Sequence, residues 1–204
     1  MNKKANIIIE LPQIVQYKTD ILLEFQKKTF ENKFIQEALR SYKKNITTLF
    51  KLSPSELLQK HGKTLSYLIE NYGLKYNIAY RYTTAKKEQS RKMNFSLYIK
   101  LLEALEYTKG SKKISLFNRD EVRFTKQTAL SIDDKTNKLI EEIQKIVENR
   151  NVDFSKKMII ENAIIFHIAK NEKVLYNHPD FANKKFLLLL IQIMKNEGLP
   201  IGKK

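Results

Sequence analysis

Apolar residues recur at helical spacing over much of the chain, with charged residues between them. In residues 19–51 this pattern predicts one long amphipathic helix, or two helices with a break near Asn45. The same spacing predicts helices at about 134–149, from Ser155 to about Asn171, and at 183–196. The fold class that the pattern predicts is therefore mostly α-helical.

Local signals mark the ends of two shorter helices in the next segment. The stretch "SPSE" places Ser53 as a cap, a proline at the first helical position and Glu56 at the third, which together favour a helix start. Gly62 is expected to end this helix, because glycine readily adopts the left-handed conformation that follows a helix. Thr64 is then expected to cap a second helix, "LSYLIENY", which ends at Gly73.

The pattern changes after residue 113. Before it, we expect a helix over about 78–87 and another that is capped by Asn94 and ends at Gly110. After it, "ISLFNRDEVRFTKQTALSID" is rich in β-branched and aromatic residues, which predicts one or two short strands. We therefore expect two domains, a helical one over 1–113 and a second over 114–204, with no visible internal repeat.

Residues 64–83 present a helix, a glycine turn and a second helix, which is the order of a helix-turn-helix element. Gly73 occupies the turn, and apolar residues around it are expected to fix the angle between the helices. In such an element the first side chains of the second helix face base edges in the major groove. Asparagine pairs well with adenine and arginine with guanine. The candidates for base reading are Tyr76, Asn77, Tyr80 and Arg81.

Basic residues around this element are candidate contacts to DNA phosphates. They are Lys75, Lys86, Lys87, Arg91, Lys92, Lys112 and Lys113. The alternative is a helical hairpin that is packed by Tyr67, Tyr72 and Ile78, with its lysines simply solvated.

The segment "TLSYLIENYGLKYNIAYRY" resembles the Cro/repressor-type helix-turn-helix and departs from it in two places. Ile69 stands where alanine is usual in the first helix. The apolar residue after the turn is Ile78, one position early, or else Ala79.

Residues 122–171 read as a short strand, a helix with an acidic start and a second, capped helix. The stretch "SKKMIIENAIIFHIA" looks like the second helix of the ribbon-helix-helix fold, in which strands of two chains pair and enter the major groove. Strand side chains alternate between two faces, so an inward Leu130 and Ile132 would turn their neighbours toward DNA. The base-reading candidates here are Gln127, Ala129 and Ser131, with Thr125 as a further one.

The same resemblance implies a phosphate contact at the start of the second helix, at Ser155 and Lys156. It also implies a homodimer, because one strand and two helices do not bury this apolar face alone. The dimer-interface candidates are Leu130, Ile132, Ile159, Ile160, Ala163 and Ile164. The alternative is an ordinary helical dimerisation domain, a role that also suits residues 186–194.

The charge of the chain strengthens the expectation of a polyanionic partner. The formal net charge is +16 with 38 basic and 22 acidic residues. Residues 60–113 hold 12 basic and 4 acidic residues, a net charge of +8, so half the excess lies in about a quarter of the chain. Clustered lysine and arginine raise affinity for nucleic acid by releasing condensed counterions.

Composition excludes several classes of chemistry. The chain has no cysteine, which excludes disulfides, thiolate zinc sites and cysteine nucleophiles. Its three histidines are isolated in the sequence, and neither a metal-ligand spacing nor a nucleophile motif is present. We therefore expect no enzyme activity and no cofactor. The apolar stretches are too short for a signal peptide or a bilayer span, so we expect a cytoplasmic protein associated with the nucleoid or a plasmid.

The stretches "YGLKYNIAYRYTTAKK" and "FSLYIKLLEALEYTKG", in a basic chain rich in lysine, asparagine and isoleucine, resemble the plasmid and chromosome partition family of Borrelia-type spirochaetes. The resemblance implies a centromere-binding partner of a ParA-type ATPase. The residues alone predict a dimeric protein that binds double-stranded DNA. Alternatives are a transcriptional repressor that uses the same helix-turn-helix, and a non-catalytic RNA-binding or assembly protein.

Overall fold

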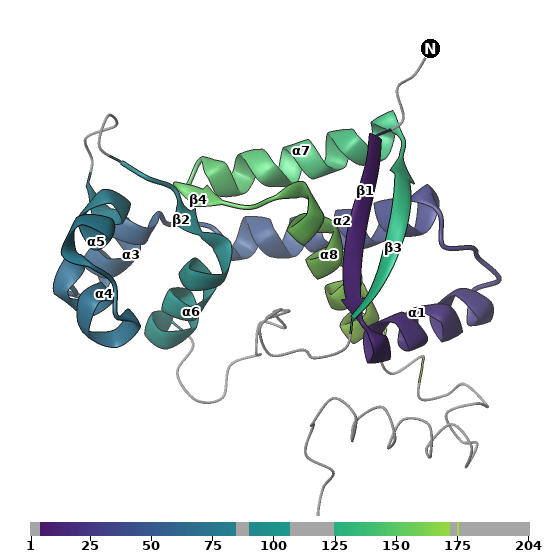
Figure 1. Cartoon of the computed structure of the whole chain (residues 1–204), viewed down its shortest axis with the longest axis horizontal. Helices are drawn as coiled ribbons and strands as arrows, with labels where there is room; N and C mark the ends of the chain where they lie inside the picture. Colours follow the sequence, from purple (N-terminus) through teal and green to yellow (C-terminus); the bar gives the residue numbers. More distant parts are fainter. Residues whose placement is uncertain (1–4, 85–89, 107–124, 172–174, 176–204) are drawn as a thin grey trace, which may run out of the picture. The chain divides into compact units, whose positions relative to one another are not determined.

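A computed structural model describes residues 5–84, 90–106, 125–171 and 175 of the 204-residue chain (Figure 1). Its elements are β1 (Ala5–Pro12), α1 (Gln13–Phe25), α2 (Asn32–Leu49), α3 (Pro54–Lys60), α4 (Leu65–Tyr72), α5 (Tyr76–Thr83), β2 (Met93–Asn94), α6 (Phe95–Glu106), β3 (Thr125–Ile132), α7 (Asp134–Glu148), β4 (Val152–Asp153) and α8 (Lys156–Lys170). The prediction of a mostly α-helical protein is confirmed. The helix expected at 183–196 lies outside the described residues.

Two helix starts that the sequence marks locally are found where they were expected. Ser53 and Glu56 form a reciprocal capping box on α3, and the Oδ1 atom of Asn94 accepts a hydrogen bond from the amide of Ser96 at 2.9 Å. Thr64 precedes α4 but its side chain makes no capping hydrogen bond, and α5 runs over Tyr76–Thr83 rather than over the expected 78–87. The predicted break near Asn45 is wrong, because α2 runs through it. The break lies between α1 and α2, where Lys27 takes a left-handed conformation with φ of 51°.

The described residues form two compact units that are discontinuous in sequence. Unit 1 takes in residues up to 42, 125–140 and from 157 onward, and unit 2 takes in 43–106 and 141–156. The expected division between residues 113 and 114 does not separate these units, since each draws on both sides of it. The physical reason in unit 1 is that β1 pairs with β3, which joins the start of the chain to its second half.

In unit 1, β1 and β3 form a two-stranded antiparallel ribbon (Figure 1). Ile8 lies opposite Ala129, with Asn6 opposite Ser131 and Glu10 opposite Gln127. Directly opposite residues share a face of the ribbon, and successive residues alternate between faces. One face carries the buried side chains of unit 1's core, and the other carries these six residues.

The succession of one strand and two helices occurs twice in unit 1. The expectation of no internal repeat is therefore wrong. β1 leads into α1 and α2, and β3 leads into α7 and α8. The buried positions of the two second helices match one for one. Phe34, Ile35, Gln36, Ala38, Leu39 and Tyr42 of α2 correspond to Ile159, Ile160, Glu161, Ala163, Ile164 and His167 of α8, and all twelve are buried. The two halves share a burial pattern with few identical residues, so the repeat is not visible as sequence identity.

Unit 2 holds α3 to α6 together with the short parallel pair of β2 and β4. Phe95 of α6 stacks on Phe154 with ring centroids 3.7 Å apart, and Phe50 stacks on Phe95 at 5.6 Å. All three rings are almost fully buried. This aromatic cluster ties residues 141–156 to the helical segment that contains α4 and α5.

Candidate nucleic-acid interface

Helices α4 and α5 are joined by a tight turn at Gly73, as the sequence predicts. Gly73 has φ of 63° and ψ of 25°, and its amide donates to the carbonyl of Ile69 at 3.0 Å. No heavy atom lies within 4 Å of the position that a Cβ would occupy there, so the left-handed backbone alone favours glycine. Lys75 precedes the first turn of α5 in an extended conformation.

Helix α5 has one buried face and one exposed face. Ala79 is fully buried and Tyr82 is 8 % exposed, whereas Tyr76 is 64 % exposed. Asn77 and Arg81 are exposed, and Tyr80 is half-buried. Ala79 is thus the apolar residue that packs after the turn, while Ile78 is only half-buried. Tyr76, Asn77, Tyr80 and Arg81 share the outer side of the helix, because residues four apart lie one above the other.

Two tyrosine rings stack on each other on this outer side of α5. The rings of Tyr76 and Tyr80 stack with centroids 6.3 Å apart and planes inclined by 11°. Tyr72 behaves differently, since its hydroxyl donates to the carbonyl of Lys100 at 3.3 Å and its ring meets that of Tyr67 edge-on. Burial is the main reason that the pKa of Tyr72 rises to about 12. Tyr72 therefore has a packing role, as the hairpin interpretation expects, whereas Tyr76 does not.

The predicted phosphate contacts of unit 2 fall into three groups. Lys75 and Arg91 are exposed. Lys92 forms an ion pair with Glu148 at 3.2 Å, so its charge is partly neutralised within the protein. Lys86, Lys87, Lys112 and Lys113 lie outside the described residues. The amide of Arg91 donates to the carbonyl of Arg81 at 2.8 Å, which holds these two basic residues near each other.

The outer face of the ribbon in unit 1 places the strand candidates as the alternation predicts. Leu130 and Ile132 are buried, and Gln127, Ala129 and Ser131 are exposed. The side chain of Thr125 lies outside the described set. β1 contributes the exposed Asn6, the 56 % exposed Ile8 and the half-buried Glu10 to the same face. Sequence reasoning missed these three residues, because the run "NIIIE" lacks the clean alternation of a one-sided strand.

The residues expected at a dimer interface lie inside the single chain. Leu130, Ile132, Ile159, Ile160, Ala163 and Ile164 are all at most 6 % exposed. The strand that was expected from a second chain is supplied by β1, and the missing helices are α1 and α2. The argument that this apolar face requires a second chain is therefore wrong. Whether the protein forms a homodimer through another surface stays a prediction.

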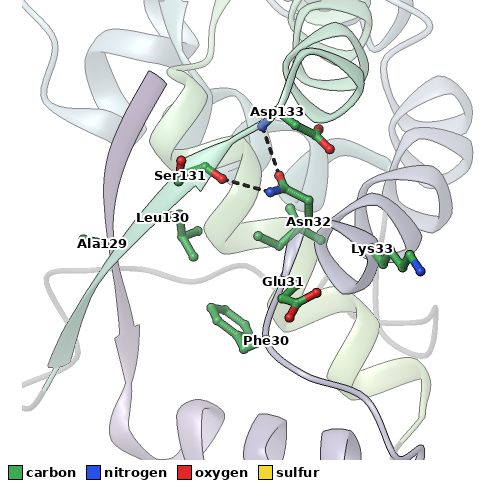
Figure 2. A pocket seen from close by; sticks show the side chains of 9 residues that line it. Phe30, Glu31, Asn32, Lys33, Ala129, Leu130, Ser131 and Asp133 are labelled. Atoms are coloured by element: carbon green, nitrogen blue, oxygen red, sulfur yellow. Dashed lines mark hydrogen bonds between the residues drawn. The ribbon is translucent and has the colours of Figure 1, made fainter. Parts of the chain in front are cut away.

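Asn32, the first residue of α2, fastens that helix to the end of β3 (Figure 2). Its Nδ2 atom donates to the carbonyl of Ser131 at 2.9 Å, and its Oδ1 atom accepts from the amide of Asp133 at 3.2 Å. The Oγ1 atom of Thr136 donates to the same Oδ1 at 2.9 Å. Hydrogen bonding from Thr136 holds the pKa of Asp133 below its usual range. Asn32, Ser131 and Asp133 border a pocket of about 440 Å³ that Phe30 and Lys33 also line (Figure 2).

The start of α8 holds the end of β1 in an equivalent way. Glu161 accepts a hydrogen bond from the amide of Glu10 at 2.7 Å. Lys157 forms ion pairs with Glu10 at 3.4 Å and with Glu161 at 3.9 Å. Glu161 corresponds to Gln36 in the repeat, and Lys157 corresponds to Asn32. The first turns of α2 and α8 therefore lie at the two opposite ends of the ribbon.

The predicted phosphate contacts at the start of α8 have mixed surroundings. Ser155 is exposed and directly precedes the helix. Lys156 forms an ion pair with Glu141 at 3.3 Å. A phosphate would have to compete with that carboxylate for the Lys156 ammonium group.

In the described part of the chain, no group of His, Cys, Asp or Glu residues has the arrangement of a metal site. None of the helices in that part is long and apolar enough to cross a bilayer. Comparison with protein families, with characterised proteins and with solved structures found no match to this chain.

Proposed function

We propose that this protein binds double-stranded DNA in a sequence-specific way. The observation that carries the proposal is the two-faced helix α5, which is positioned by the left-handed turn at Gly73. Its inner side packs through Ala79, and its outer side presents an amide, a guanidinium and two stacked tyrosines. These are groups that bond base edges and phosphates, and they stand on the first turns of the helix, where a helix-turn-helix reads the major groove.

The charge of the chain supports the same partner. Lysine and arginine outnumber acids by 16, and the concentration over 60–113 includes the region of α4 and α5. Exposed Lys75 and Arg91 flank α5 in sequence. A helical hairpin with a merely packing role needs no exposed tyrosine, so the 64 % exposure of Tyr76 favours the binding interpretation.

The proposal extends to replicon partition, on the resemblance to the spirochaete partition family. In that role the protein loads on a centromere-like DNA site and couples it to a ParA-type ATPase. A transcriptional repressor with the same helix-turn-helix is the second candidate. If a ParA-type ATPase is encoded beside this gene, stimulation of its ATP hydrolysis by the DNA-bound protein supports partition. Specific DNA binding without any such stimulation supports the repressor.

Fluorescence anisotropy with duplex DNA over a range of salt concentrations tests the binding proposal. Arg81→Ala should weaken binding to a preferred duplex by about 1–3 kcal/mol and relax the preference at one base position. Arg40→Ala is the matched control, because Arg40 is an exposed arginine on α2 and has no part in the proposed interface. Lys75→Ala should weaken binding to all duplexes alike and reduce the salt dependence. Equal, sequence-independent losses for Arg81→Ala and Lys75→Ala would show that α5 does not enter the groove.

A further inference from the structure

The β1–β3 ribbon is a two-stranded antiparallel sheet whose two strands both come from one chain. Its inner face is fully committed to the core of unit 1 through Ile9, Leu11, Leu130 and Ile132. Its outer face does not pack against that core. Among the described residues, the exposed large hydrophobic side chains are Ile8 on this outer face and Tyr76 of α5. A two-stranded ribbon fits the width of the DNA major groove.

The two ends of the ribbon are flanked by features that favour phosphate groups. α2 begins at the β3 end, where Asn32 bonds the carbonyl of Ser131, and α8 begins at the β1 end, where Glu161 bonds the amide of Glu10. Helix N-termini favour anions, because their amides and the helix dipole point toward the ligand. Lys33 is exposed in the first turn of α2, whereas Lys157 in the first turn of α8 is already paired with Glu10 and Glu161.

We infer that a single chain supplies the complete ribbon and that this ribbon reads a DNA site without internal twofold symmetry. The inference rests on the proposed DNA-binding function. The two strands occupy equivalent positions about the pair Ile8–Ala129 but carry different side chains there. Asn6 corresponds to Gln127, Ile8 to Ala129, and Glu10 to Ser131. A ribbon built from two identical chains would present each side chain twice and would select a symmetric site.

The outer side chains indicate what such a site contains. Asn6 and Gln127 are the amide side chains that pair with adenine, and they lie toward opposite ends of the ribbon. Ile8 and Ala129 form an apolar centre that suits thymine methyl groups. Glu10 accepts a hydrogen bond from Gln127 at 3.0 Å and is paired with Lys157, which it shares with Glu161, so its negative charge is partly compensated. The site expected at the ribbon is therefore rich in A·T pairs and differs between its two ends.

Cysteine cross-linking tests the single-chain ribbon without any DNA. The chain has no native cysteine, so any disulfide that forms must join the introduced cysteines. Ile8→Cys with Ala129→Cys places the two residues opposite each other in an antiparallel pair, whose Cα separation suits a disulfide. Oxidation of the full chain should give an internal disulfide that runs as a monomer on a non-reducing gel. Ala129→Cys alone should stay monomeric. A covalent dimer from Ala129→Cys alone, or from the double variant, overturns the inference.

Selection of preferred duplexes from a random pool tests the reading itself. The full-length chain should select a motif that is not an inverted repeat. Asn6→Ala and Gln127→Ala should each remove the preference at one base position, at different places in the motif, with about a tenfold or larger loss of affinity for the selected duplex. Asn149→Ala and Gln59→Ala, both exposed and outside the ribbon, are the matched controls and should leave the motif unchanged.

The outcomes separate this inference from the proposed function. If Asn6→Ala and Gln127→Ala leave the motif intact while Arg81→Ala changes it, the ribbon does not read DNA and the α5 proposal stands. If each ribbon variant alters two symmetric positions, the ribbon comes from two chains and the inference is overturned. If no duplex is bound above a random pool at any salt concentration, the proposed function and the inference both fail.

Discussion

Removal of the Asn32 side chain should loosen the connection between α2 and the ribbon. Asn32 makes three hydrogen bonds, to the carbonyl of Ser131 at 2.9 Å, from the amide of Asp133 at 3.2 Å and from the hydroxyl of Thr136 at 2.9 Å. Each such bond contributes about 0.5–1.5 kcal/mol net. Asn32 is half-buried, so water replaces part of the loss. We therefore expect Asn32→Ala to lower the free energy of unfolding by about 1–2 kcal/mol, at the lower end of the sum.

Urea unfolding followed by circular dichroism at pH 7 measures this loss. Asn32→Asp keeps the acceptor for Asp133 and Thr136 but loses the donor to Ser131, so it should fall between the wild type and Asn32→Ala. Asn45→Ala is the control, because Asn45 lies mid-helix in α2, where alanine favours the helix. The reasoning is refuted if Asn32→Ala costs no more than Asn45→Ala, or if Asn32→Asp is as destabilising as Asn32→Ala.

Three further predictions concern the turn, a buried histidine and the aromatic cluster. Gly73→Ala and Gly62→Ala should each lower the free energy of unfolding in urea by about 1 kcal/mol, because both glycines are left-handed with φ near 60°. Only Gly73→Ala should also reduce specific DNA affinity. Equal effects of the two variants on affinity would argue against a turn that positions α5. Burial lowers the pKa of His167, so protonation favours the unfolded chain and stability should fall as pH drops below about 6.5. The His167→Leu variant should lose less stability over that pH range. The same dependence of unfolding free energy on pH in both proteins would contradict this. Phe154→Ala should destabilise by about 3–5 kcal/mol, because its ring is fully buried against Phe95; a loss below about 1 kcal/mol would show that the stack is not formed.

Features with a local cause were predictable from the sequence. The caps at Ser53 and Asn94 and the left-handed glycines at 62 and 73 each depend on residues within three or four positions. Helix α7 follows from apolar residues at clear helical spacing, and α8 follows from an apolar run that is long enough for a buried helix. For the same reason the exposed outer side of α5 could be placed from helical geometry, once Gly73 set the start of the helix.

Features with a distant cause were not predictable. β1 pairs with a strand more than a hundred residues away, and the exposure of Ile8 depends on that pairing rather than on its neighbours. Asn32 resembles an ordinary polar residue after "KKTFE", yet all three of its hydrogen-bond partners come from the second half of the chain. The repeat escapes notice because Tyr42 and His167 share a buried position and little else.

The ratio of two affinities tests the central claim most directly. The full-length chain is titrated, at one physiological salt concentration, against its selected duplex and against a scrambled duplex of the same composition. Specific DNA-binding proteins discriminate by about a thousandfold or more under such conditions, and we expect a ratio of that order. A ratio close to one, with single-stranded RNA of the same length bound equally well, would contradict the account.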